Sequence, residues 1–275
     1  MTTELRRSPS TVMNIDWIYD LPALSLAAVV VGSLTCFGLV GMRVTRPLVV
    51  RWLGDPHPHN DVVSLLLATL GVLYGITLGL VSIAAWEAYE GTASGVDQEV
   101  AVAAALIADV DLLPEPARTE VLQSIALWRD HVVNESWPAQ REGLKPESES
   151  AMLHRVERAL VNFVPRTATE GALLAAALSE VNGLVRLGMQ RFEAVESGLP
   201  RILWRIVILG AIQLIVCLWL QSSAKISLVY FSTAMVAGLL GLLIFFLAEV
   251  NNPLRGDYGI SSDGFRDLRI NLTAP

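Results

Sequence analysis

The feature that most constrains the fold is the stretch between Asp61 and Glu87, in which Tyr74 is the only ionisable side chain. As an α-helix it is about 37 Å long, and the hydrocarbon core of a bilayer is about 30 Å thick. Asn60 or Asp61 can cap the first turn, because a short polar side chain accepts a hydrogen bond from an unpaired backbone N–H group. The stretch therefore predicts a membrane-spanning helix over residues 61–86.

The composition also indicates a membrane protein. Of the 275 residues, 53% are hydrophobic and only 17% are charged, whereas soluble globular chains carry about 25% charged residues. The net charge of −7 argues against a nucleic-acid partner, because binding phosphates requires a basic surface. Lys145 and Lys225 are the only lysines, a bias that favours a bacterial source with a GC-rich genome. We therefore expect a multi-pass protein of a bacterial inner membrane, with the lipid bilayer as its first partner.

Three more apolar runs predict spanning helices, at about 21–42, 201–221 and 226–248. The first run is longer than the apolar core of a signal peptide, about 7–15 residues, and no cleavage-site pattern follows it. Pro47 lies in the arginine-rich segment 43–59 and is expected to break any helix there. The sequence thus predicts an all-α membrane protein with four transmembrane helices.

A helical domain outside the membrane is predicted between the second and third spans. The second helix is expected to continue to residue 112, because apolar residues recur at helical spacing along it. Further helices are predicted at 117–136, 151–164 and 170–197, with a loop at 138–148. The expected organisation is a first transmembrane hairpin, a helical domain, a second hairpin and a tail: 1–87, 88–199, 200–249 and 250–275.

The second span has two distinct faces. Gly71, Gly75 and Gly79 recur every four residues and form a stripe that another helix backbone can approach closely. The opposite face is apolar and either lines a pore or meets lipid or a neighbouring helix. If several copies surround an axis, Glu87 forms a charged ring at the exit of this span. The candidate pore-lining residues are Leu66, Leu70, Leu73, Thr77, Ala84 and Glu87.

No catalytic signature is present, so an enzyme is not expected. The chain lacks a Gly-rich phosphate loop and the H-E-x-x-H, C-x-x-C and G-x-S-x-G motifs. His57 and His59 are too few ligands for a metal site. The cysteines, Cys36 and Cys217, lie in separate apolar runs and are interpreted as packing residues. We expect neither a cofactor nor a metal.

Four segments of the chain resemble the bestrophin-like membrane proteins of unknown function. They are NDVVSLLLATLGVLYGITLGLVSIAAWEAYEG at 60–91, NESWP at 134–138, GLPRILWRIVI at 198–208 and EVNNPLRGDYGIS at 249–261. This family is distantly similar to the bestrophins, which are pentameric anion channels. The resemblance implies four spans per subunit, a cytoplasmic helical domain and a pore lined by the second span. The chain departs from bestrophins in lacking aromatic neck residues in that span and a dense acidic cluster in the tail.

Two functions remain open at this point. The first is a homo-oligomeric channel, by resemblance a pentamer, that passes small ions with anions favoured. The alternative is a non-conducting membrane scaffold or sensor whose helical domain binds a partner protein. The side of the membrane on which the 88–199 domain lies is also open. The three arginines of the 43–59 loop favour placing that loop in the cytoplasm. The count is a near-tie, because other arginines flank the spans on the domain side: Arg6, Arg7, Arg201, Arg205, Arg255, Arg266 and Arg269. The resemblance places the domain in the cytoplasm.

Overall fold

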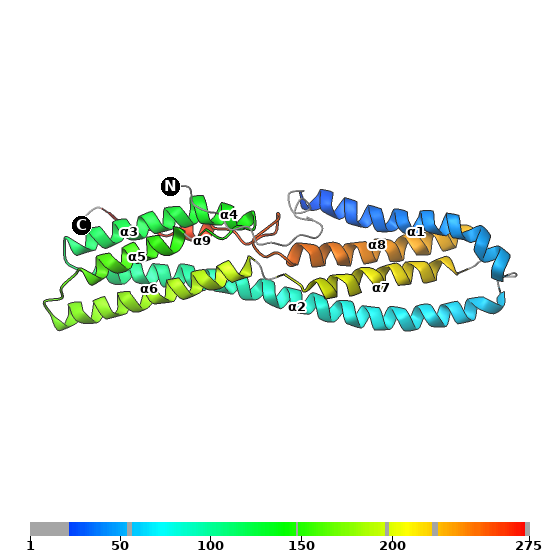
Figure 1. Ribbon diagram of the computed structural model, residues 1–275, viewed down its shortest axis with the longest axis horizontal. Helices are drawn as coiled ribbons and strands as arrows, with labels where there is room; N and C mark the ends of the chain where they lie inside the picture. Colours follow the sequence, from blue (N-terminus) through cyan, green and yellow to red (C-terminus); the bar gives the residue numbers. More distant parts are fainter. Residues whose placement is uncertain (1–21, 54–56, 147, 196–197, 222–224, 273–275) are drawn as a thin grey trace.

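The computed structural model describes residues 22–53, 57–146, 148–195, 198–221 and 225–272. The described residues are mostly helical and contain no β-strand. Two groups of helices lie end to end, and α2 runs through both (Figure 1). The main helices are α1 (Ala23–Leu53), α2 (His57–Asp111), α3 (Ala117–His131), α5 (Ser148–Val161), α6 (Ala168–Ala194), α7 (Arg201–Trp219) and α8 (Ile226–Val250).

The first group is an apolar bundle built from α1, α7, α8 and the first half of α2. Helix α1 lies along α8, while α7 contacts the other three helices. The buried centre contains Tyr74 and Leu78 of α2, Ile215 of α7 and Leu247 of α8. Many of the outward side chains of these helices are large and apolar, which is the pattern expected where the surroundings are lipid.

The second group is the predicted helical domain. Its core joins the second half of α2 to α3, α5 and α6, and it contains Trp128 and Val181. The short helix α9 (Asp263–Arg266) lies in the C-terminal tail and inserts Phe265 into this core. The continuous helix expected from the second span into the domain is confirmed, because α2 extends without interruption to Asp111.

Two local predictions were wrong. Helix α1 does not end before Pro47 but continues to Leu53, because proline removes only its own backbone hydrogen bond and bends a helix that neighbouring turns can sustain. Figure 1 shows α1 bending at this end. The predicted 138–148 loop is also shorter than expected. A π-helical turn, Val132–Ser136, leads directly into α4 (Trp137–Arg141), where Pro138 occupies the first turn that tolerates it.

Five described helices are long and apolar enough to cross a membrane, one more than the four expected. The additional one is α6. Its buried side chains, among them Ala177, Val181 and Leu184, belong to the domain core and not to the apolar bundle.

Candidate functional site

Helix α2 is held to the apolar bundle along one face only. Tyr74, Leu78, Val81 and Ala85 are buried, and they recur at the three- and four-residue spacing of a single helical face. The Tyr74 hydroxyl donates a hydrogen bond of 2.9 Å to the carbonyl of Val207 in α7. The rotational position of α2 is therefore fixed by its contacts within the chain.

Most of the predicted pore-lining residues lie outside this buried face. Leu66 and Leu73 are 47% and 59% exposed, and Ala84 and Glu87 are also exposed. Leu70 and Thr77 are partly buried, and Leu70 packs against the core of the bundle. The predicted face thus lies at the border between the buried and the uncovered sides of α2.

The centre of the uncovered side contains residues that the sequence interpretation did not single out. These large apolar side chains are exposed within the chain, and at 100° per residue they lie roughly opposite the buried face. They are Leu65, Val72, Ile76 and Ile83. Their arrangement can be recognised only once the buried face is known.

The glycine stripe of α2 is open within the chain. A methyl group added at Gly71, Gly75 or Gly79 would have no atom of another element within 4 Å. The stripe is therefore not a contact between helices of the described chain.

The close helix contacts of the bundle use other glycines. Gly210 of α7 lies against the ring of Tyr74. Gly41 of α1 lies against the ring of Trp219, whose indole N–H donates to the carbonyl of Gly38 at 2.9 Å. No local sequence pattern indicates these pairs, because each joins a glycine to a residue more than 100 positions away.

The bundle and the domain meet at a set of polar and aromatic contacts. Trp86 stacks on Tyr89, with the ring centroids 5.6 Å apart. The Tyr89 hydroxyl donates to the carbonyl of Tyr258 in the tail at 2.9 Å, and the Asp257 carboxylate accepts from the backbone N–H of Ala23 at 2.7 Å. The tail thus connects the first turn of α1 to the middle of α2.

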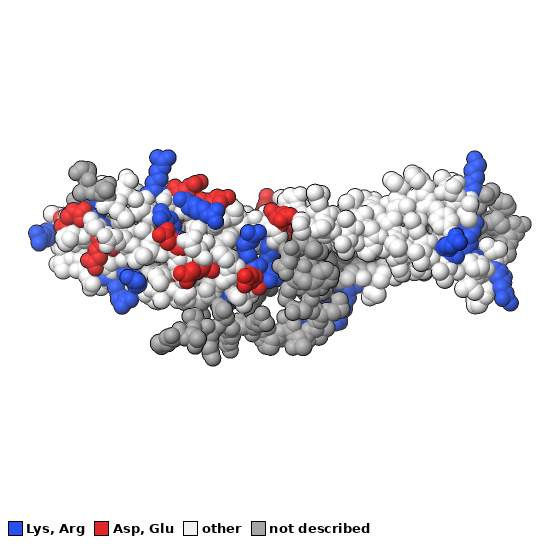
Figure 2. Space-filling view, turned by 90° about the horizontal axis from the view of Figure 1, so that it is seen from above, with Lys and Arg blue, Asp and Glu red and all other residues white. Residues whose placement is uncertain are grey.

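Charged residues are distributed differently over the domain and the apolar bundle. In Figure 2, acidic and basic residues mix over the half of the molecule that contains the domain. The bundle forms a largely uncharged belt, and basic residues gather at its far end, where α1 ends. Arg43, Arg46 and Arg51 belong to that end of α1.

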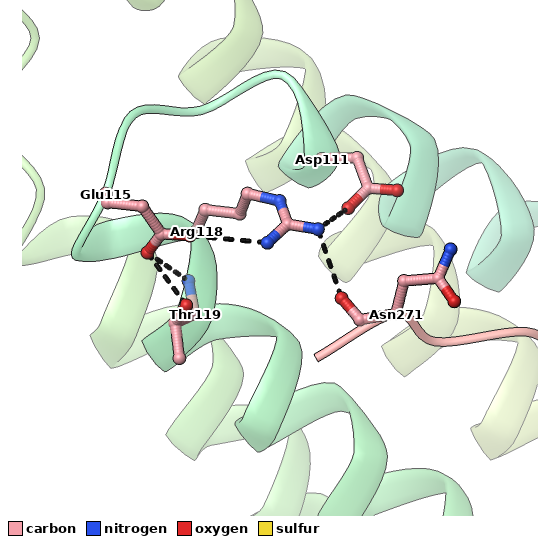
Figure 3. A network of polar contacts seen from close by, with 5 residues as sticks. All are labelled: Asp111, Glu115, Arg118, Thr119 and Asn271. Carbon is pink, nitrogen blue, oxygen red and sulfur yellow. Dashed lines mark hydrogen bonds and ion pairs between the residues drawn. The ribbon is translucent and has the colours of Figure 1, made fainter. Parts of the chain in front are cut away.

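The far end of the tail is anchored by Arg118 of α3 (Figure 3). The guanidinium group bonds the Asp111 carboxylate at 2.9 Å, the Glu115 carboxylate at 3.3 Å and the carbonyl of Asn271 at 3.1 Å. Hydrogen bonds from Thr119, together with Arg118, hold the pKa of Glu115 below its usual value. These bonds connect Asn271 of the tail to the turn between α2 and α3.

A buried charged cluster at the centre of the domain was missed by the sequence interpretation. Arg191 of α6 bonds both carboxylate oxygens of Glu99 at 2.9 and 3.1 Å, Glu149 at 2.6 Å and the amide oxygen of Gln140 at 2.6 Å. The guanidinium also lies 5.2 Å from the ring centroid of Trp137. The partners of Arg191 are 42 to 92 residues away, so no local pattern announces the cluster.

The described residues contain no group of three His, Cys, Asp or Glu side chains arranged to hold a metal. The side chains of His57 and His59 lie outside the described part of the chain.

One known family matches most of the chain. The Bestrophin-like domain matches residues 31–265, a range that includes both the apolar bundle and the helical domain. The chain belongs to the bestrophin-like family. No curated protein and no solved structure matches this bestrophin-like chain.

Proposed function

We propose that the bestrophin-like chain is one subunit of a homo-oligomeric membrane channel for small ions, with anions favoured by the family relationship. In this proposal α1, α7, α8 and the first half of α2 are the four spans. Helix α6 stays outside the bilayer, because its buried side chains belong to the domain core and Arg191 lies among them.

The observation that carries the proposal is the uncovered side of α2. Along the span, one face of α2 packs on its own chain, while Leu66, Leu73, Val72 and Ile76 are exposed. Copies arranged around an axis place this side toward a common centre. The open glycine stripe then lies at a flank of α2, where a neighbouring subunit can approach closely.

An apolar lining gives such a pore a specific behaviour. Rings of Val72 and Ile76 at the centre of this side, together with Leu66 and Leu73 at its border, form a narrow dry constriction, and a hydrophobic constriction gates conduction by dewetting. Glu87 lies beyond the constriction, toward the domain, where a carboxylate stays hydrated. Its charge opposes the entry of anions at that end.

The deciding experiment reconstitutes the full chain in liposomes and measures chloride and potassium flux. A Leu73→Ser substitution adds a hydroxyl to the constriction, so flux is expected to rise. Leu239→Ser is the matched control, because Leu239 of α8 is exposed to a similar degree but lies on another helix. Glu87→Gln is expected to shift selectivity toward chloride without changing assembly.

The opposite outcome favours the scaffold or sensor. An intact oligomer of the Leu73→Ser protein that leaks neither ion above empty liposomes contradicts the pore. A purified monomer or dimer also contradicts it, because it has no central axis for α2 to line.

A further inference from the structure

The buried cluster around Arg191 has an unbalanced charge. Glu99, Glu149 and Arg191 are 0%, 1% and 3% exposed, so water does not screen them. Arg191 is the one cation that bonds these carboxylates in the described part of the chain. Two carboxylates around one guanidinium leave one negative charge in excess, and an uncompensated buried charge is strongly unfavourable.

The cluster also has an unpartnered carboxylate oxygen. Both oxygens of Glu99 accept hydrogen bonds from Arg191, whereas Glu149 uses only Oε1. Oε2 of Glu149 is buried without a hydrogen-bond partner. The side-chain nitrogen of Gln140, whose oxygen accepts from Arg191, is unpartnered as well, so polar hydrogen-bonding capacity remains unused in the cluster.

Other ionisable groups approach the cluster only indirectly. His131 of α3 is hydrogen-bonded to the hydroxyl of Ser148 at 2.9 Å, and Ser148 precedes Glu149 in α5. The second ring nitrogen of His131 lies 3.1 Å from Glu135. The contacts of Arg191 with Trp137 and Phe265 come from aromatic rings, which carry no charge that could balance the second carboxylate.

We propose that this cluster is a proton-binding site, in which Glu99 and Glu149 share one proton and thereby make the packing of α2, α4, α5 and α6 sensitive to pH. The proton removes the excess charge, and the second carboxylate remains paired with Arg191. Both carboxyl groups contact the same guanidinium, so the proton belongs to the pair. The NESWP segment contributes directly, because the ring of its Trp137 lies 5.2 Å from the Arg191 guanidinium.

The direction of the pH effect follows from burial. Burial raises the pKa of Glu99, the charge of Glu149 raises it further, and the charge of Arg191 opposes both. Between the ordinary glutamate pKa of about 4.3 and the raised value, the folded protein holds a proton that the unfolded chain has released. The free energy of unfolding therefore falls as the pH rises through this window, and it is constant above it.

Loss of the proton affects α2, the helix that continues from the cluster into the bilayer. Glu99 belongs to α2, which runs unbroken from the cluster into the apolar bundle. Loss of the proton weakens the contacts that hold this part of α2 to α5 and α6. This pH sensitivity belongs to the domain itself and does not depend on ion conduction.

The test measures the thermal midpoint Tm of the full-length protein in detergent across the pH range. For wild type, Tm is expected to fall with rising pH, with the unfolding equilibrium constant changing by up to about tenfold per pH unit for one proton. Glu149→Gln keeps the oxygen that Arg191 contacts and removes the charge, so it should flatten this slope and raise Tm at alkaline pH.

Two controls isolate the cluster from other titrating groups. Glu193→Gln removes an exposed carboxylate of the same helix as Arg191 and should leave the wild-type slope unchanged. His131→Asn should also retain the slope, because the proposal assigns the proton to the carboxyl pair. Parallel curves for wild type and Glu149→Gln would overturn the proposal.

Infrared spectroscopy of wild type gives a second, direct readout. At neutral pH exposed carboxyl groups are ionised, so a C=O stretching band of a protonated carboxyl group reports a buried one. This band is expected to persist above the pH at which the exposed carboxyl groups ionise, and it should disappear as the pH rises further. A spectrum in which no such band outlasts the exposed carboxyl groups would overturn the proposal even if the Glu149→Gln variant failed to fold.

Discussion

At the scale of single residues, the bundle depends on glycines that face large aromatic rings. Gly210→Ala would push a methyl group into the ring of Tyr74, whose position is fixed by its bond to Val207. We expect this overpacking to lower the free energy of unfolding by about 1–3 kcal/mol, measured as a drop in Tm. Gly71→Ala is the matched control, because the added methyl group meets open space within the chain. Equal drops in Tm for the two variants would contradict the close contact between Gly210 and Tyr74.

A second residue-scale prediction concerns the anchor of the tail. Arg118→Ala removes bonds to Asp111, Glu115 and the carbonyl of Asn271, so unfolding near neutral pH should become easier by about 1–2 kcal/mol. Because the pKa of Glu115 is lowered in the folded protein, its contribution is present above the ordinary glutamate pKa and is lost as pH falls through the lower value. The difference in Tm between wild type and Arg118→Ala should therefore shrink in acid. Arg155→Ala, at an exposed position of α5, is the control.

At the scale of elements, the sequence predicted the helices better than their contacts. The apolar run 61–86 and the periodicity after Glu87 predicted the continuous helix α2, because both signals are local in sequence. The break expected at Pro47 was wrong, because the rule describes the cost of proline and not the packing of α1 along α8. The cluster around Arg191 was unpredictable, since its charges come from three helices and each, taken alone, resembles a solvated surface residue.

The glycine stripe of α2 gives an element-scale prediction. If it contacts a second copy, Gly75→Leu separates the helices and shifts the purified protein toward smaller assemblies, as measured by light scattering. Its Tm as a monomer should change little, because nothing of its own chain lies near Gly75. Gly32→Leu on α1, also open within the chain, is the control. An unchanged assembly for Gly75→Leu would place the stripe against lipid.

At the scale of the whole molecule, the two ends of the bundle differ in charge and in what they join. One end leads into the helical domain, and the other carries Arg43, Arg46 and Arg51 (Figure 2). The arginines of this end favour the cytoplasm, but Arg201 and Arg205 at the start of α7 favour the domain side, so the basic residues are nearly balanced. The family relationship instead favours a cytoplasmic position for the domain. Because the domain folds around a tail that returns from α8, its side of the membrane is also the side of the tail.

Labelling of single cysteines in intact cells decides between these orientations. With Cys36 and Cys217 replaced, Gln123→Cys reports the domain and Val50→Cys reports the far end, since both positions are exposed. By family analogy we expect a membrane-impermeant thiol reagent to modify Val50→Cys rapidly and Gln123→Cys only after the cells are permeabilised. The reverse pattern would show that the arginines had set the orientation. It would also place the domain, with its buried cluster, on the external side of the membrane, so that the proposed site would respond to extracellular pH. Modification of both positions in intact cells would contradict the membrane-spanning bundle itself, because the bundle lies between them.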